Sequence, residues 1–294
     1  MESLVWSARP SLRKGVLVCA FSGWNDGGEA ATLSALFLRR QLDAQPFCEF
    51  DPDEFYDFQH VRPIVSAGED DTRHISWPEN SFAWAPLPSG NDIAVMIGVE
   101  PNNRWRHYSR SVIEVARESG AELVVTLGGF LADTPHTRPV PVTGSADGEL
   151  ADTLGLAPSS YEGPTGIVGV VHEACREAGI ASASLWAAVP HYISVSPNPK
   201  AALALLSRLA LLLDTRFDMT KLSQDAVSFE REVSQAVSAD DKISRYVREL
   251  ETRADENAEA DADEESPPLL EGGEDIAAQI ERYLAEREET SDDS

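Results

Sequence analysis

Polar residues and glycines that could bind a ligand follow four apolar runs of the chain, in segments 22–28, 100–104, 128–136 and 190–192. Small residues let backbone N–H groups approach an anion, arginine can hold a carboxylate or phosphate through two hydrogen bonds, and histidine can act as a general base. The candidate ligand-binding residues are Gly23, Trp24, Asn25, Asp26, Gly28, Glu100, Arg104, Gly128, Gly129, His136 and His191.

Each of these side chains also has a purely structural explanation. Asp26 and Glu29 lie where a helix accepts acidic residues in its first turn, so they can cap that helix and repel anions. In so acidic a chain, Arg104 and Arg138 can simply pair with Asp or Glu. A lone loop histidine is more often a hydrogen-bonded structural residue than a catalyst.

No complete catalytic motif accompanies these residues. The glycine segment 22–28 matches neither G-x-x-x-x-G-K-[ST] nor G-x-G-x-x-G. Ser22 or Ser145 can be combined on paper with His191 and Asp26 as a triad, but the G-x-S-x-G elbow is missing. The sequence also lacks metal-ligand spacing. We therefore assign no catalytic residue, metal or cofactor.

The elements that position these segments form an alternating pattern. Compact apolar runs at 15–21, 91–99, 122–127 and 182–189 predict buried strands, and amphipathic stretches between them predict helices. Such alternation predicts a three-layer α/β fold, with a mostly parallel sheet and helices on both faces. Ligand sites in these sheets form outside the carboxyl ends of the strands, so the four segments should share one edge. Residues 1–215 are expected to form this core domain.

Two further parts are expected outside the alternating pattern. Segment 51–87, with Trp77 and Trp84, predicts an inserted β-hairpin that either forms an oligomer contact or folds back on the core. Residues 216–294 predict a helical C-terminal extension, with an acidic disordered linker at 251–268 and a terminal helix at 275–287. The extension can bind a basic groove or fold over the strand ends as a lid.

Composition excludes several partner classes. The net charge is −26, and residues 251–294 alone contribute −14, so we expect no binding to nucleic acids or to anionic membranes. Three cysteines are too few for a disulfide framework, and Cys19 and Cys175 lie in apolar patterns that indicate buried thiols. The first residues do not match a signal peptide. These features favour a cytoplasmic protein.

Several ordered motifs resemble the proteasome assembly chaperone family, in its actinobacterial branch. They are FSGWNDGGEA (21–30), FYDF followed by RP (55–63), GVEPNNRW (98–105), LGGFLADTPHTRPVPVTG (127–144), YEGPTGIVG (161–169) and VPHYISVSPNP (189–199). The resemblance covers residues 1–250 and implies a phosphorylase/hydrolase-like α/β domain with an inserted hairpin, a helical C-terminal lid and a homotrimeric state. It carries no catalytic residues over; Gly23, Trp24, Asp26 and Gly28 match only as a motif.

Two functions are therefore compared. The first is a non-enzymatic, assembly-chaperone-like or scaffold protein of the cytoplasm, with a protein partner in a proteasome-related assembly. The alternative is a hydrolase- or phosphorylase-like enzyme, or a small-ligand binder, that uses a pocket at the strand ends. The sequence leaves enzymatic activity undecided and favours the first function.

Overall fold

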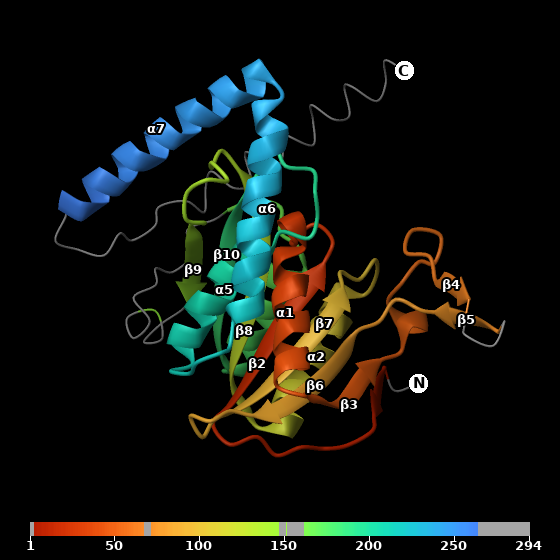
Figure 1. Cartoon of the computed structure of the whole chain (residues 1–294). Coiled ribbons are helices and arrows are strands. Elements are labelled where there is room, and N and C mark those ends of the chain that lie inside the picture. Colours follow the sequence, from red (N-terminus) through yellow and green to blue (C-terminus); the bar gives the residue numbers. More distant parts are fainter. Residues whose placement is uncertain (1–2, 68–71, 147–150, 152–161, 264–294) are drawn as a thin grey trace.

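The computed structural model describes residues 3–67, 72–146, 151 and 162–263. Its main sheet has eight strands in the order β1-β3-β6-β7-β2-β8-β10-β9 (Figure 1). The four central strands are β7 (Asp92–Val99), β2 (Gly15–Ser22), β8 (Ala121–Ala132) and β10 (Ala181–Pro190), and each runs parallel to its neighbours among them. These are the four strands that the apolar runs predict.

The flanking strands make the sheet mixed. On one side β6 (Ser81–Pro86), β3 (Gln45–Phe50) and β1 (Leu4–Trp6) continue the sheet in antiparallel order. On the other side β9 (Val142–Ala146) pairs antiparallel with β10. The parallel part is thus the centre of the sheet, where both faces are covered.

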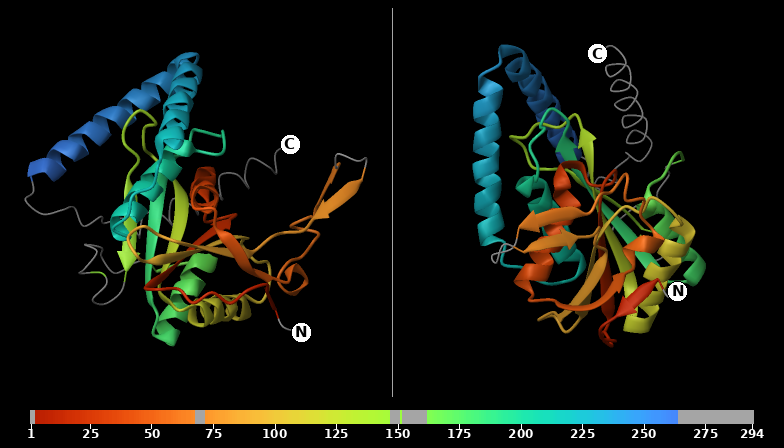
Figure 2. Two further views of the ribbon diagram at one scale, coloured as in Figure 1. Left: turned by 60° about the horizontal axis from the view of Figure 1, so that its bottom comes forward. Right: turned by 90° about the vertical axis from the view of Figure 1, so that its right-hand side faces the viewer.

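Helices cover both faces and complete three layers, which confirms the predicted fold class (Figure 2). Successive side chains of a strand point to opposite faces. Accordingly, Val16, Val18 and Ala20 of β2 pack with α1 (Ala30–Gln41) and α5 (Pro199–Leu212). Leu17 and Phe21 pack on the other face with α2 (Trp105–Ser119) and α4 (Ile167–Ala178).

The inserted hairpin is shorter than the sequence predicts. Strands β4 (Ile64–Ala67) and β5 (Arg73–Ser76) form a separate two-stranded sheet that extends away from the main body (Figures 1 and 2). The last part of the predicted insertion, 81–86, is instead strand β6 of the main sheet. Trp84 therefore packs against the core, whereas Trp77 lies next to the hairpin. The prediction of one insertion over 51–87 is corrected in this respect.

The C-terminal extension consists of α6 (Thr220–Ser238) and α7 (Asp241–Asp263) in the part of the chain that the structure describes. Helix α6 packs on α5. Helix α7 includes residues 251–263, which the sequence analysis assigned to a disordered linker. Alanine and glutamate are strong helix formers, and the contacts of Glu251 and Asp255 with Arg138 anchor this part of the helix. The terminal helix expected at 275–287 lies outside the described residues, and the division at 215 stays a prediction.

The three cysteines are buried free thiols, as expected for Cys19 and Cys175. Burial raises the pKa of each, to about 12 for Cys48 and Cys175. In the described ranges, every helix is too short or too polar to span a bilayer.

Candidate functional site

The segments at the carboxyl ends of the four parallel strands meet at one edge of the sheet, as predicted, although β8 runs to Ala132 and so includes Gly128 and Gly129, which were expected in a loop. Backbone hydrogen bonds join three of them: the Gly129 amide donates to the Asn25 carbonyl over 2.9 Å, and the Glu100 amide donates to the Ser22 carbonyl over 3.0 Å. Asp26 and Gly129 also form a parallel β-bridge. We call this edge, formed by residues 22–28, 100–104, 128–136 and 190–192, the strand-end rim.

Asp26 occupies the first helix N-terminus at the rim. Its buried carboxylate accepts hydrogen bonds from the amides of Ala31, over 2.7 Å, and Thr32, and from the Thr32 hydroxyl. Burial raises the pKa of Asp26, while these hydrogen bonds act in the opposite direction. The chain thus supplies its own anion to the N-terminus of α1.

Glu100 occupies the second helix N-terminus. Its Oε1 accepts a hydrogen bond from the Ile167 amide over 2.8 Å, at the start of α4. The same oxygen accepts from the side-chain amide of Asn25 over 3.0 Å. A phosphate from solution would meet a carboxylate at the N-terminus of α1 and another at the N-terminus of α4. The backbone N–H groups near 22–28 that could bind an anion are therefore already engaged.

The rim glycines allow close packing. A Cβ on Gly129 would lie 2.5 Å from the Gly27 carbonyl oxygen, and one on Gly128 would lie 2.4 Å from the Trp186 ring. Gly28 has a positive φ of 61° and its carbonyl accepts from the Asn198 amide over 2.7 Å. Gly23 also has a positive φ, and Trp24 beside it is 41% exposed. Close packing and positive φ angles thus explain the glycines at these positions without a ligand.

His136 lies in a second cluster, at the ends of β8 and β10. Its ring is buried: Nδ1 lies 2.8 Å from the Tyr192 hydroxyl, and Nε2 lies 3.0 Å from the Ser234 hydroxyl of α6. Burial, followed by the charge of Lys200, lowers the pKa of His136. His191 Nδ1 lies 3.0 Å from Asp133 Oδ1 instead. The two histidines do not bond to Asp26.

Polar contacts attach the C-terminal helices to this second cluster. Arg138 binds both carboxylate oxygens of Asp255, over 2.7 and 2.8 Å, and lies 3.6 Å from Glu251. The Tyr246 hydroxyl donates to Asp133 over 2.9 Å. Helices α6 and α7 therefore contact this end of the rim, and the lid interpretation stays a prediction. The sequence analysis predicted that Arg138 can pair with Asp or Glu, but it did not identify Glu251 and Asp255 of α7 as the partners.

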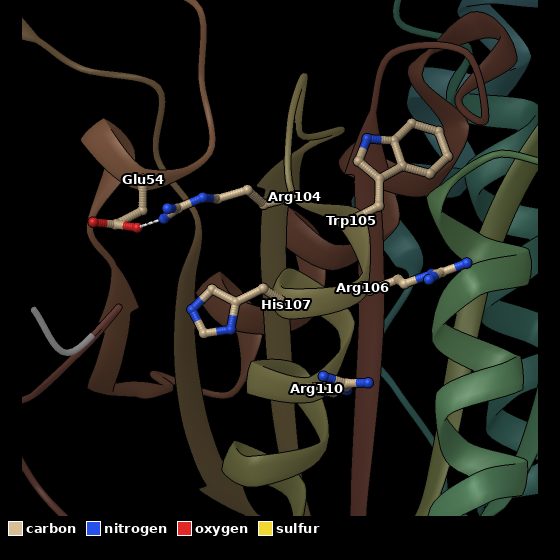
Figure 3. Close-up of a pocket in the computed structure, with 6 residues that line it drawn as sticks. All are labelled: Glu54, Arg104, Trp105, Arg106, His107 and Arg110. Carbon is tan, nitrogen blue, oxygen red and sulfur yellow. Dashed lines mark hydrogen bonds and ion pairs between the residues drawn. The ribbon is translucent and has the colours of Figure 1, made fainter.

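Arg104 lies apart from both clusters. It pairs with Glu54 and lines a surface hollow of about 690 Å³ together with Trp105, Arg106, His107 and Arg110 (Figure 3). The predicted site residues are thus distributed over three places. Sequence reasoning missed the hollow, although the i, i+4 spacing of Arg106 and Arg110 on a predicted helix places both on one face.

Comparisons with known proteins give one family. The PAC2 family matches residues 20–237. A PAC2 family protein from Streptomyces avermitilis is 44% identical, with a TM-score of 0.73, over 79% of this chain and 99% of that one. A proteasome-assembly chaperone homologue from Mycobacterium tuberculosis is 42% identical, with a TM-score of 0.72 and the same coverage. The Pyrococcus furiosus proteasome activator PbaB, at 19% identity and a TM-score of 0.64 over 79% of this chain and 97% of that one, shares the fold. No curated protein matches the chain.

Replacing Asp26 with alanine should lower the free energy of unfolding of the ligand-free protein. The amides of Ala31 and Thr32 lose their acceptor, and loss of a helix-capping acceptor costs about 0.5–2 kcal/mol. Urea unfolding would measure the change, with the exposed Asp225→Ala in α6 as the control. The capping role would be contradicted if Asp26→Ala lowers the free energy of unfolding by no more than Asp225→Ala does.

Acid should weaken the contact between α6 and the rim. The folded-state pKa of His136 is depressed, so its stabilising contribution is present above the unfolded pKa of about 6.5 and is lost as the pH falls below it. Between about pH 7.5 and 5.5, the protection factors of the α6 amides against hydrogen exchange should fall more in the wild type than in His136→Gln. An equal fall in both proteins would show that other groups cause the effect.

Proposed function

Since the chain belongs to the PAC2 family, we propose that it is a non-enzymatic, chaperone-like or scaffold protein that acts on proteasome-related assemblies in the cytoplasm. Its support among relatives is the 42% identical protein from Mycobacterium tuberculosis, which is a proteasome-assembly chaperone homologue. The activator from Pyrococcus furiosus adds a likeness of fold only.

The observation that carries this proposal is the filled strand-end rim. In α/β sheets a ligand normally enters at this edge, where helix N-termini attract anions. Here Asp26 and Glu100 take the hydrogen bonds that a bound anion would accept. A rim closed by the chain's own carboxylates suits a rigid scaffold that presents its outer surfaces to other proteins.

The alternative, a hydrolase- or phosphorylase-like enzyme, has less support. The carboxylate of Asp26 is engaged with α1, and His191 is engaged with Asp133. The Ser145 hydroxyl bonds the Ser184 hydroxyl over 2.8 Å, on the antiparallel pair of β9 and β10. Among the described residues, no hydrogen bond joins Ser22 or Ser145 to His191, or His191 to Asp26, so the triad that can be drawn from the sequence is not assembled.

The β4–β5 hairpin is the surface we propose for a homotrimer contact. Its large apolar side chains are exposed: Ile64 at 69%, Ile75 at 56% and the adjacent Trp77 at 49%. Trp77 makes a T-shaped contact with Phe58, at 4.8 Å between ring centroids, which orients its ring. An exposed apolar surface of this kind is typical of a protein–protein contact.

Substituting Ile64 and Trp77 together with serine should lower the mass measured by light scattering, from that of a trimer to that of a monomer. The side chains are already exposed in one chain, so folding should survive. The control is Val227→Ser on α6, where the side chain is 68% exposed. An unchanged mass in the double variant would place the contact elsewhere.

Assembly of an actinobacterial proteasome from separate α and β subunits tests the function. Added in equal amount, the chain should bind α or β subunits on native gels and increase the rate at which rings form. The hairpin variant separates the function from oligomerisation, because it can become monomeric and still bind proteasome subunits. Absence of binding together with an unchanged rate would refute the proposed function.

A further inference from the structure

The hollow beside α2 differs from the strand-end rim in its charge. Its wall carries three guanidinium groups, from Arg104, Arg106 and Arg110, against one carboxylate, from Glu54 (Figure 3). Trp105 and His107 complete the lining. In a chain with a net charge of −26, this concentration of cations is the reverse of the general composition.

Two of the three arginines have no partner among the described residues. Arg104 pairs with Glu54, but no hydrogen bond or ion pair joins Arg106 or Arg110 to another described side chain. By contrast, Arg13 and Arg138 each hold a carboxylate with two hydrogen bonds. Where acidic groups outnumber basic ones, unpaired neighbouring guanidinium groups indicate a binding surface for anions.

These cations also oppose the stability of their own helix. They lie in the first turns of α2, where the helix dipole favours acidic residues, and the first turn contains none. Arg104, at the N-cap, has a positive φ of 57° and donates no capping contact. Glu54 neutralises only Arg104 among these three cations, so a binding role explains Arg106 and Arg110 better than folding does.

The shape of the surface suits a chain segment. A second hollow of about 350 Å³ shares Arg110 with the first, but its wall carries three carboxylates, from Glu114, Glu118 and Glu177, against Arg110 and Arg117. The excess of cations is therefore confined to the first hollow. An enclosed pocket would favour a small molecule, whereas an open, cationic surface hollow favours an acidic peptide.

We infer that the cationic hollow beside α2 binds the acidic C-terminal segment of the same chain, residues 264–294. This segment carries eleven Asp or Glu and two Arg, a net charge of −9. Its 31 residues follow the described end of α7 at Asp263, and an extended chain of that length reaches about 100 Å, enough to reach any surface of one subunit. Exposed ion pairs are individually weak, and covalent attachment supplies the effective concentration that makes them form.

This inference does not depend on the proposed chaperone function, because it concerns a contact within one chain. It predicts that salt weakens the contact between the segment and the hollow, since exposed charges are screened strongly above physiological ionic strength. It also predicts that the contact survives exchange of arginine for lysine, because both side chains keep their charge.

The test treats the full-length variant Arg106→Lys/Arg110→Lys with a carbodiimide. This reagent joins lysine amines to carboxylates that are in contact with them. Mass spectrometry should find links from the introduced lysines to Asp or Glu within 264–294. Their yield should exceed that of Arg231→Lys, an exposed control in α6, by at least about tenfold and fall in about 0.5 M salt. A mixture of isotope-labelled and unlabelled protein should give links only within one copy.

Other outcomes overturn the inference. A yield equal to that of the Arg231→Lys control, or a yield unaffected by salt, would show that the hollow has no preference for the segment. Links between labelled and unlabelled copies, in the share expected for random pairing, would assign the hollow to the segment of a second molecule. Near-ultraviolet circular dichroism of each variant checks that a missing link does not result from misfolding.

Discussion

The structure depends on how the positive ends of its helices are neutralised where the parallel strands finish. Parallel strands need crossover helices, and these helices begin at the carboxyl edge of the sheet. There Asp26 receives amides of α1, and Glu100 receives the first amide of α4. Because Asn25 also binds Glu100, one polar network joins β2, β7 and α4. The edge that serves many α/β proteins as a ligand site is therefore part of the internal framework in this one.

The central fold could be predicted because its signals are local. Helix α2 spans Trp105–Ser119, as its amphipathic pattern predicts, and Gly120 ends it with a positive φ of 79°. Runs of apolar residues buried on both faces identified the four parallel strands. The antiparallel strands β1, β3 and β9 were not predicted, since their pairing joins segments distant in sequence, such as Leu4 with Phe50. The helical state of 251–263 likewise accompanies a contact between Arg138 and Asp255, which are 117 positions apart.

The candidate site was predicted in part. Topology brought the four loops to one edge, but topology does not determine where each side chain points. Arg104 follows β7 and pairs with Glu54, whereas Glu100, also after β7, bonds Asn25. His136 is directed toward α6, whose position no local pattern specifies. The residues on one edge thus belong to separate clusters with separate electrostatics: an anionic framework, a covered histidine cluster and a cationic hollow.

The burial of every cysteine has a consequence for the chemistry of the cell. A thiol reacts with oxidants and alkylating agents as its thiolate, and burial raises the pKa of Cys48 and Cys175 to about 12. At neutral pH almost none of either group is ionised, and burial raises the pKa of Cys19 as well. The thiolate that oxidants and disulfide exchange require is therefore scarce in the folded chain. An oxidant should modify exposed thiols of other proteins before it modifies these three.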